Sequence, residues 1–184
     1  MSLYHHVRDK EALLDRMADA VVGEIPRPDD TGDWVARLRA LIVAARGTML
    51  RHPWSAHVLE SRGQPGPATL AHIDHVLGIL RDGGVSLDMA HHALHVLGSR
   101  VLGFDDSLFD DAPVEDTDPA MVEAQARAWA STLPHVAELA LAARHDGALG
   151  ACDDDAEFAF ALDLILDGLA RAAGADQSAE SGDV

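Results

Sequence analysis

The sequence predicts an all-α protein, and three observations support this fold class. Apolar residues recur at spacings of three and four along most segments, which is the period of one helix face. Aspartate, serine and proline stand where helices would begin, and proline and glycine stand where they would end. No segment shows the alternation of apolar and polar residues that half-buried strands show. With 184 residues, 48% hydrophobic and 4% aromatic, the chain can build one core of closely packed helices.

Two helices are predicted at the N-terminal end of this core. The first runs from Lys10 to about Gly23, with Asp9 as its N-cap. The segment EIPRPDDTGD follows, and its two prolines and three aspartates predict a linker. Asp33 is then expected to cap a second helix from Trp34 to about His52, which Pro53 ends.

Three further helical segments precede an acidic loop. A short helix is predicted from about Trp54 to Ser61, followed by the turn RGQPGP. A longer one runs from Pro67 to about Asp82 and ends at DGGV. Ser86 is expected to cap the next, which extends to about Phe104. The segment DDSLFDDAPVEDTDP that follows is predicted to be a loop.

The C-terminal third is predicted to hold one interrupted helix and one long helix. Pro119 opens a helix that breaks near Pro134 and resumes through Arg144. The segment ARHDGALGACDDD is predicted to be a loop, and the last helix runs from about Asp155 to Ala173. The polar tail ADQSAESGDV is expected to be disordered.

Charge and composition exclude several functional classes. The chain carries 31 acidic and 14 basic residues, a net charge of −17, so its surface as a whole repels nucleic acid and anionic membranes. The single cysteine, Cys152, allows no internal disulfide and fits a reducing compartment. We find no signal peptide and no apolar run of membrane-spanning length, and we expect a cytoplasmic protein. GxSxG, P-loop and GxGxxG motifs are absent, so no enzyme is predicted.

The N-terminal segment SLYHHVRDKEALLDRMADAVV resembles a known regulatory motif. It is similar to the end of the helix-turn-helix region in the tetracycline-repressor (TetR) family of transcriptional regulators, where a recognition helix leads into a connecting helix. The matching residues are Leu3, Tyr4, His6, Val7, Lys10, Leu13 and Leu14. The C-terminal segment DAEFAFALDLILDGLARAA resembles the dimerisation helix of the tetracycline-repressor-like branch. With the order of helices between them, the resemblance covers essentially the whole chain.

The resemblance implies a TetR-type helical fold in three parts. Residues 1–23 would be a remnant of the DNA-binding domain, 24–174 the ligand-binding and dimerisation domain, and 175–184 a disordered tail. Family members carry two further helices before this point, so we expect a truncated or mis-started regulator. The intact regulator would bind a palindromic operator as a homodimer and release it when a small-molecule effector enters, whereas this chain alone is not expected to bind DNA specifically. The positions matched to DNA contacts are Ser2, Tyr4, His5, His6 and Lys10.

Eleven histidines are a high number for this chain, and seven of them fall between His52 and His95. Several flank the apolar stripes of the predicted helices, as polar groups do in small-molecule sites. We expect a mostly apolar cavity between the helices 34–52, 67–82 and 86–104. The predicted ligand-pocket residues are His57, His72, His75, His91, His95 and Leu94. No cofactor is expected besides the effector, although His72, His75, His91 and His95 have spacings that could hold a divalent metal ion.

The last predicted helix is apolar over an arc wider than one core contact needs. Two adjacent apolar stripes make up this arc. They would form a close helix–helix contact with a second copy of the chain, or they would bury the helix in the centre of one subunit. The predicted dimer-interface residues are Phe158, Ala161, Leu162, Ile165, Gly168, Leu169 and Ala172. Two alternatives to an effector sensor remain: a histidine-based metal sensor or metalloenzyme, and a DNA-binding-deficient dimerisation partner of other regulators.

Overall fold

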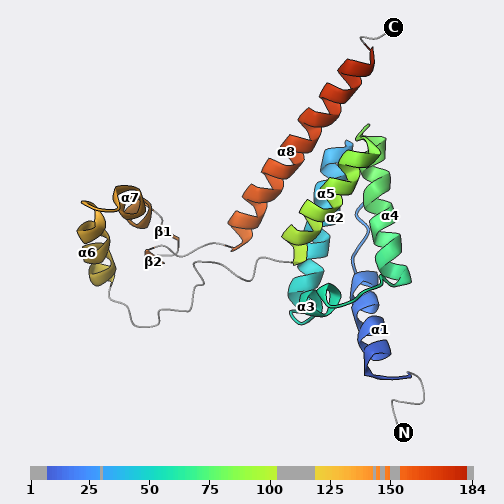
Figure 1. The fold of residues 1–184 in the computed structure, drawn as a ribbon, viewed down its shortest axis with the longest axis horizontal. Helices are drawn as coiled ribbons and strands as arrows, with labels where there is room; N and C mark the ends of the chain where they lie inside the picture. The colour runs from blue at the N-terminus through green and yellow to red at the C-terminus, as the bar shows by residue number, and fades with distance from the viewer. Residues whose placement is uncertain are drawn as a thin grey trace. The chain divides into compact units, whose positions relative to one another are not determined.

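The structure is a computed structural model that describes residues 8–29, 31–102, 119–142, 144–145, 148–149 and 154–181. Within these ranges it contains eight α-helices and two strands of two residues each, so the predicted all-α class is confirmed (Figure 1). The elements are α1 (Lys10–Gly23), α2 (Trp34–Arg51), α3 (Ser55–Glu60), α4 (Pro67–Asp82), α5 (Leu87–Leu102), α6 (Pro119–Trp129), α7 (Pro134–Ala142), β1 (Arg144–His145), β2 (Ala148–Leu149) and α8 (Asp154–Ser181).

The predicted N-caps of α1, α2 and α5 are all confirmed. The side chains of Asp9, Asp33 and Ser86 each accept a hydrogen bond from the backbone N–H three residues further on, at 2.8, 2.8 and 3.3 Å. Each bond satisfies one of the amide groups that a helix start leaves without an internal partner. The starts of these three helices are therefore fixed by local sequence.

The turn between α4 and α5 depends on Gly84. This residue has φ = 77°, a conformation that side chains disfavour. The N–H of Gly84 bonds to the carbonyl of Arg81 at 3.0 Å, and the N–H of Val85 bonds to the carbonyl of Leu80 at 3.1 Å. This is a Schellman motif, and Val85 is fully buried behind it. The motif turns the chain so that α5 packs back against α4.

The chain divides into two compact units, residues 1–104 with 161–184, and residues 105–160. In the first unit α4 packs against α1, α2 and α5, which Figure 1 shows side by side. Arg39 on α2 forms an ion pair with Asp163 on α8. In the second unit α6 packs against α7, and β1 pairs antiparallel with β2. The largest fully buried apolar side chains belong to the first unit: Leu38, Leu41, Leu80, Val85, Leu97, Leu162 and Leu166.

α1 packs against α2, α3 and α4 in the first compact unit. Two features differ from the sequence-based expectations. The predicted loop after α7 contains the short β1–β2 pair. α8 continues to Ser181, beyond the predicted end at Ala173, because the added turns contain no proline and their alanines, glutamine and glutamate favour a helix. Among the described helices, none is long and apolar enough to span a bilayer.

Candidate functional site

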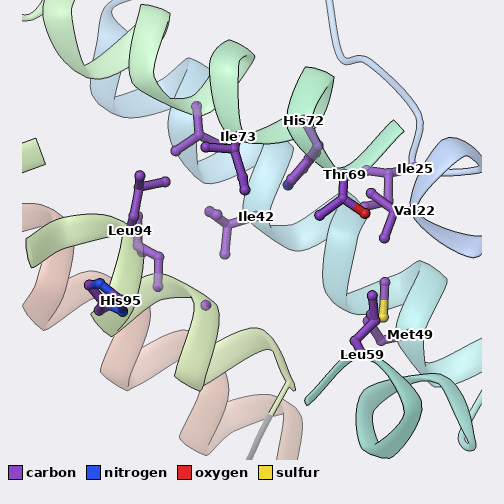
Figure 2. Close-up of a pocket in the computed structure, with 13 residues that line it drawn as sticks. Val22, Ile25, Ile42, Met49, Leu59, Thr69, His72, Ile73, Leu94 and His95 are labelled. Carbon is purple, nitrogen blue, oxygen red and sulfur yellow. The ribbon is translucent and has the colours of Figure 1, made fainter. Parts of the chain in front are cut away.

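A cavity of about 330 Å³ lies within the first unit. Its wall is built mainly from α2, α4 and α5, the three helices predicted to enclose it, with additions from α1, α3 and the residue Ile25. Figure 2 shows how ten of the lining residues lie. The lining residues are Val22, Ile25, Ile42, Met49, Leu59, Thr69, His72, Ile73, Val76, Leu94, His95, Leu97 and Gly98.

Helical spacing explains which side chains of α4 reach the cavity. Thr69, His72, Ile73 and Val76 stand at positions i, i+3, i+4 and i+7, which place them on one face of a helix. Leu70 lies on a neighbouring apolar face of α4 and is 53% exposed. Apolar residues surround more than half of α4, so periodicity alone did not distinguish the two faces.

α1 and α3 also contribute to the wall, although only the helices 34–52, 67–82 and 86–104 were predicted to do so. Val22 lies in the last turn of α1, and Ile25 follows the helix directly. Both pack in one apolar cluster with Met49 of α2 and Leu59 of α3. The signal in the sequence was the pair Val21 and Val22, which makes the end of α1 apolar on two sides. The helix next to the predicted DNA-binding segment therefore forms part of the cavity wall.

Two of the five predicted pocket histidines, His72 and His95, line the cavity together with the predicted Leu94. His57, His75 and His91 are not among the lining residues. His95 is exposed, so it lines the cavity at its open rim, beside Leu94 in Figure 2. The rings of His91 and His95 meet nearly edge to face with their centroids 4.7 Å apart. His91 thus contacts a lining residue without lining the cavity itself.

His72 is a half-buried polar group in the cavity wall. Burial lowers its pKa below the ordinary value of 6.5, and the nearby His75 and Arg27 lower it further. The imidazole is therefore neutral at neutral pH and can either donate or accept a hydrogen bond. Among the described residues, those that line the cavity include no Asp, Glu, Lys or Arg. An uncharged apolar wall with a few polar groups suits a small organic molecule.

The lowered pKa of His72 predicts a pH-dependent stability. Between the lowered folded-state pKa and 6.5, the unfolded chain binds a proton at His72 that the folded chain does not. The free energy of unfolding should therefore fall as the pH drops below about 6.5, and His72→Gln should remove this part of the decline. Urea titrations between pH 8 and pH 5 measure the difference between the two proteins. His92→Gln, at an exposed histidine, is the control, and parallel curves for wild type and His72→Gln would contradict the assignment.

The possible metal site at His72, His75, His91 and His95 finds no support. The first two belong to α4 and the last two to α5. Within the part of the chain that the structure describes, no group of three or more His, Cys, Asp or Glu side chains could hold a metal ion. Helical spacing brings each pair together, but the packing of α4 on α5 does not join the pairs. A histidine-based metal sensor or metalloenzyme is therefore not proposed.

The residues matched to DNA contacts lie almost entirely outside the described ranges. Ser2, Tyr4, His5 and His6 are not described, and Lys10 is the first residue of α1. Their predicted role stays a prediction.

The predicted dimer-interface residues on α8 fall into two sets. Phe158 and Leu162 are buried within the single chain, together with Leu166 and Ala173. The others are partly exposed: Ala161, Ile165, Gly168, Leu169 and Ala172. Phe160 and Leu164, which are not among the predicted interface residues, are 62% and 57% exposed. An exposed apolar face remains on α8 after the core of the chain is formed.

Comparison with known proteins shows what this chain is similar to. A family model described as the tetracyclin repressor-like C-terminal domain matches residues 25–173. The transcriptional repressor DrrR1 of Streptomyces coeruleorubidus is 29% identical over 176 residues, which cover 92% of this chain and 64% of the repressor. The class C tetracycline repressor of Escherichia coli is 27% identical over 175 residues, covering 92% of this chain and 75% of that protein.

The fold also matches solved structures. ActR of Streptomyces coelicolor in complex with actinorhodin superposes with a TM-score of 0.73 at 24% identity, covering 94% of this chain and 81% of ActR. At this identity the likeness concerns the fold. The chain spans slightly less than two thirds of the length of the DrrR1 repressor.

Proposed function

Because this chain belongs to the tetracycline repressor family, we propose that it is the effector-sensing and dimerising part of a ligand-responsive transcriptional repressor. Members of this family are transcriptional regulators rather than enzymes. They act as homodimers that bind small-molecule effectors and operator DNA. For this chain we propose a cytoplasmic homodimer that responds to a small molecule, with no membrane partner.

The observation that carries the proposal is the cavity between α2, α4 and α5. It is large enough for a small organic molecule, its wall is apolar, and His72, Thr69 and His95 supply a few hydrogen-bonding groups. The similar ActR structures include complexes with actinorhodin and with (S)-DNPA. We propose that a small molecule occupies the cavity of this chain as well. The effector would carry few charges, because the wall offers no charged partner among the lining residues that the structure describes.

The same proposal gives a role to the exposed face of α8 and to the N-terminal residues. The partly exposed face of α8, with Gly168 at its centre, would meet the corresponding face of a second copy. In the intact regulator, Ser2, Tyr4, His5, His6 and Lys10 would contribute to operator binding. The net charge of −17 makes any such contact local, because the surface as a whole repels DNA.

A thermal-shift screen of metabolite and drug-like libraries tests the proposed function. A compound that binds only the folded state at a hundred times its dissociation constant should add about 2.7 kcal/mol to the stability. For the compounds found, His95→Ala should weaken binding roughly threefold to tenfold, the value of one net hydrogen bond. His92→Ala is the matched control on the same helix, because His92 is exposed and does not line the cavity. A complete absence of hits, or equal losses in both variants, would contradict an effector site in this cavity.

A further inference from the structure

An acidic residue of α1 caps the start of α4. The carboxylate of Asp19 accepts hydrogen bonds from the backbone N–H groups of Ala68 and Thr69, at 3.2 and 2.9 Å. It also accepts one from the hydroxyl of Thr69, at 3.1 Å. The N-cap residue of α4 is Gly66, which has no side chain for this purpose. The free amide groups at the start of α4 are thus satisfied by a residue about 50 positions earlier in the chain.

Gly66 makes this contact possible by leaving room for it. A Cβ atom at position 66 would lie 2.4 Å from both Cγ and Oδ1 of Asp19, and 2.8 Å from its Cβ. These distances are far below van der Waals contact, and the clash reaches the Cβ of Asp19, which side-chain rotation moves little. The backbone of Gly66 has φ = −78°, so any residue could adopt its conformation. The glycine is therefore needed for the close approach of α1 to α4.

Thr69 belongs to this contact and to the cavity wall at the same time. Its side chain lines the cavity next to Val22 and Ile25, as Figure 2 shows. A threonine hydroxyl has one proton to donate, and here that proton goes to Asp19. An ion-paired link also starts from α1, in which Arg62 binds Glu11 and Asp15 at 2.7 and 3.3 Å, and it involves no cavity-lining residue.

We infer that Asp19 is the positioning residue through which occupancy of the cavity changes the position of α1. This inference rests on the proposed function, in which α1 leads from the DNA-binding segment to the sensor. An effector that presents a hydrogen-bond acceptor to Thr69 competes with Asp19 for the single hydroxyl proton and weakens the link between α1 and α4. An effector group that only donates bonds to the lone pairs of the hydroxyl oxygen leaves the link intact.

The inference can be tested on this chain without knowing the effector, by amide hydrogen exchange read by mass spectrometry. Thr69→Val removes the hydroxyl from the cavity wall and keeps the shape of the side chain. Gly66→Ala pushes on Asp19 from outside the cavity. Both variants should speed exchange of the α1 amides about tenfold, while the amides of α2 and α5 keep their wild-type rates.

Three variants serve as matched controls. Thr69→Ser keeps the hydroxyl. Gly63→Ala makes the same change as Gly66→Ala three residues earlier, where a Cβ would meet no described atom within 4 Å. Ile73→Val alters the cavity wall one turn further along α4 without touching the link. All three should leave α1 exchange as in the wild type.

Two results would overturn the inference. If Thr69→Val and Gly66→Ala speed exchange equally in α1, α2 and α5, Asp19 contributes only general stability. If Ile73→Val speeds exchange of the α1 amides as much as Thr69→Val does, the cavity does not act on α1 through Asp19. Neither result depends on the effector screen, so the inference and the proposed function can fail separately.

Discussion

Replacing Gly168 with leucine should dissociate the proposed homodimer into folded monomers. Within the described part of the single chain, a Cβ at position 168 would meet no atom within 4 Å, so a larger side chain fits the isolated subunit. In a dimer with two-fold symmetry the added side chain would enter the interface twice. Overpacking costs about 1–3 kcal/mol at each site, so the dissociation constant should rise on the order of a hundredfold or more.

Light scattering at micromolar concentration measures this effect. The wild type should show twice the mass of the chain, and Gly168→Leu should show the mass of one chain with an unchanged far-ultraviolet circular dichroism spectrum. Gly78→Leu is the matched control, because Gly78 is an exposed helical glycine on α4 with equally open space around its Cβ among the described atoms. A monomeric wild type, or a Gly168→Leu variant that stays dimeric, would show that this face of α8 is not the interface.

Helix positions could be predicted from the sequence because their signals are local. The caps Asp9, Asp33 and Ser86 act within three residues, and Pro53 and Gly84 end helices through their own backbone geometry. The face of a helix that points into the core could be predicted only where the helix has a single apolar stripe. On α2, Leu38, Ile42, Ala45 and Met49 stand at helical spacing and are all buried.

The inward faces of α4 and α5 were harder to predict because both helices are apolar over a wider arc. Leu70 on α4 and Leu87 on α5 are both apolar, yet they are 53% and 69% exposed. Which of two apolar faces turns inward depends on the neighbouring helices, and helical periodicity contains no information about them.

The candidate site shows the same division between local and long-range information. His72 and His95 could be recognised because they stand beside apolar stripes at helical spacing. The same rule selected His57, His75 and His91, since it cannot tell which margin of a stripe faces the cavity. The contact between Asp19 and Thr69 joins positions 50 residues apart, and nothing in either local sequence indicates it. Long-range pairings of this kind follow from tertiary packing.

Replacing Gly98 with leucine should block effector binding without weakening the fold. Gly98 lines the cavity on α5, one helical turn after Leu94 and therefore on the same face. No described atom lies within 4 Å of a Cβ built at this position. The side chain of leucine would thus project from the cavity wall, and its four carbon atoms would occupy part of the 330 Å³.

The matched comparison is again with Gly78→Leu, which places the same side chain on α4 at a position that does not line the cavity. Both substitutions replace glycine inside a helix and should raise helix stability by somewhat less than the roughly 0.8–1.0 kcal/mol that separates glycine from alanine. The melting temperature without effector should therefore rise or stay unchanged in both variants. With a compound that stabilises the wild type by about 2.7 kcal/mol at a hundred times its dissociation constant, Gly78→Leu should keep the shift and Gly98→Leu should lose most of it. If Gly98→Leu is folded and binds the compound as tightly as the wild type does, the effector occupies another site and the cavity has no sensing role.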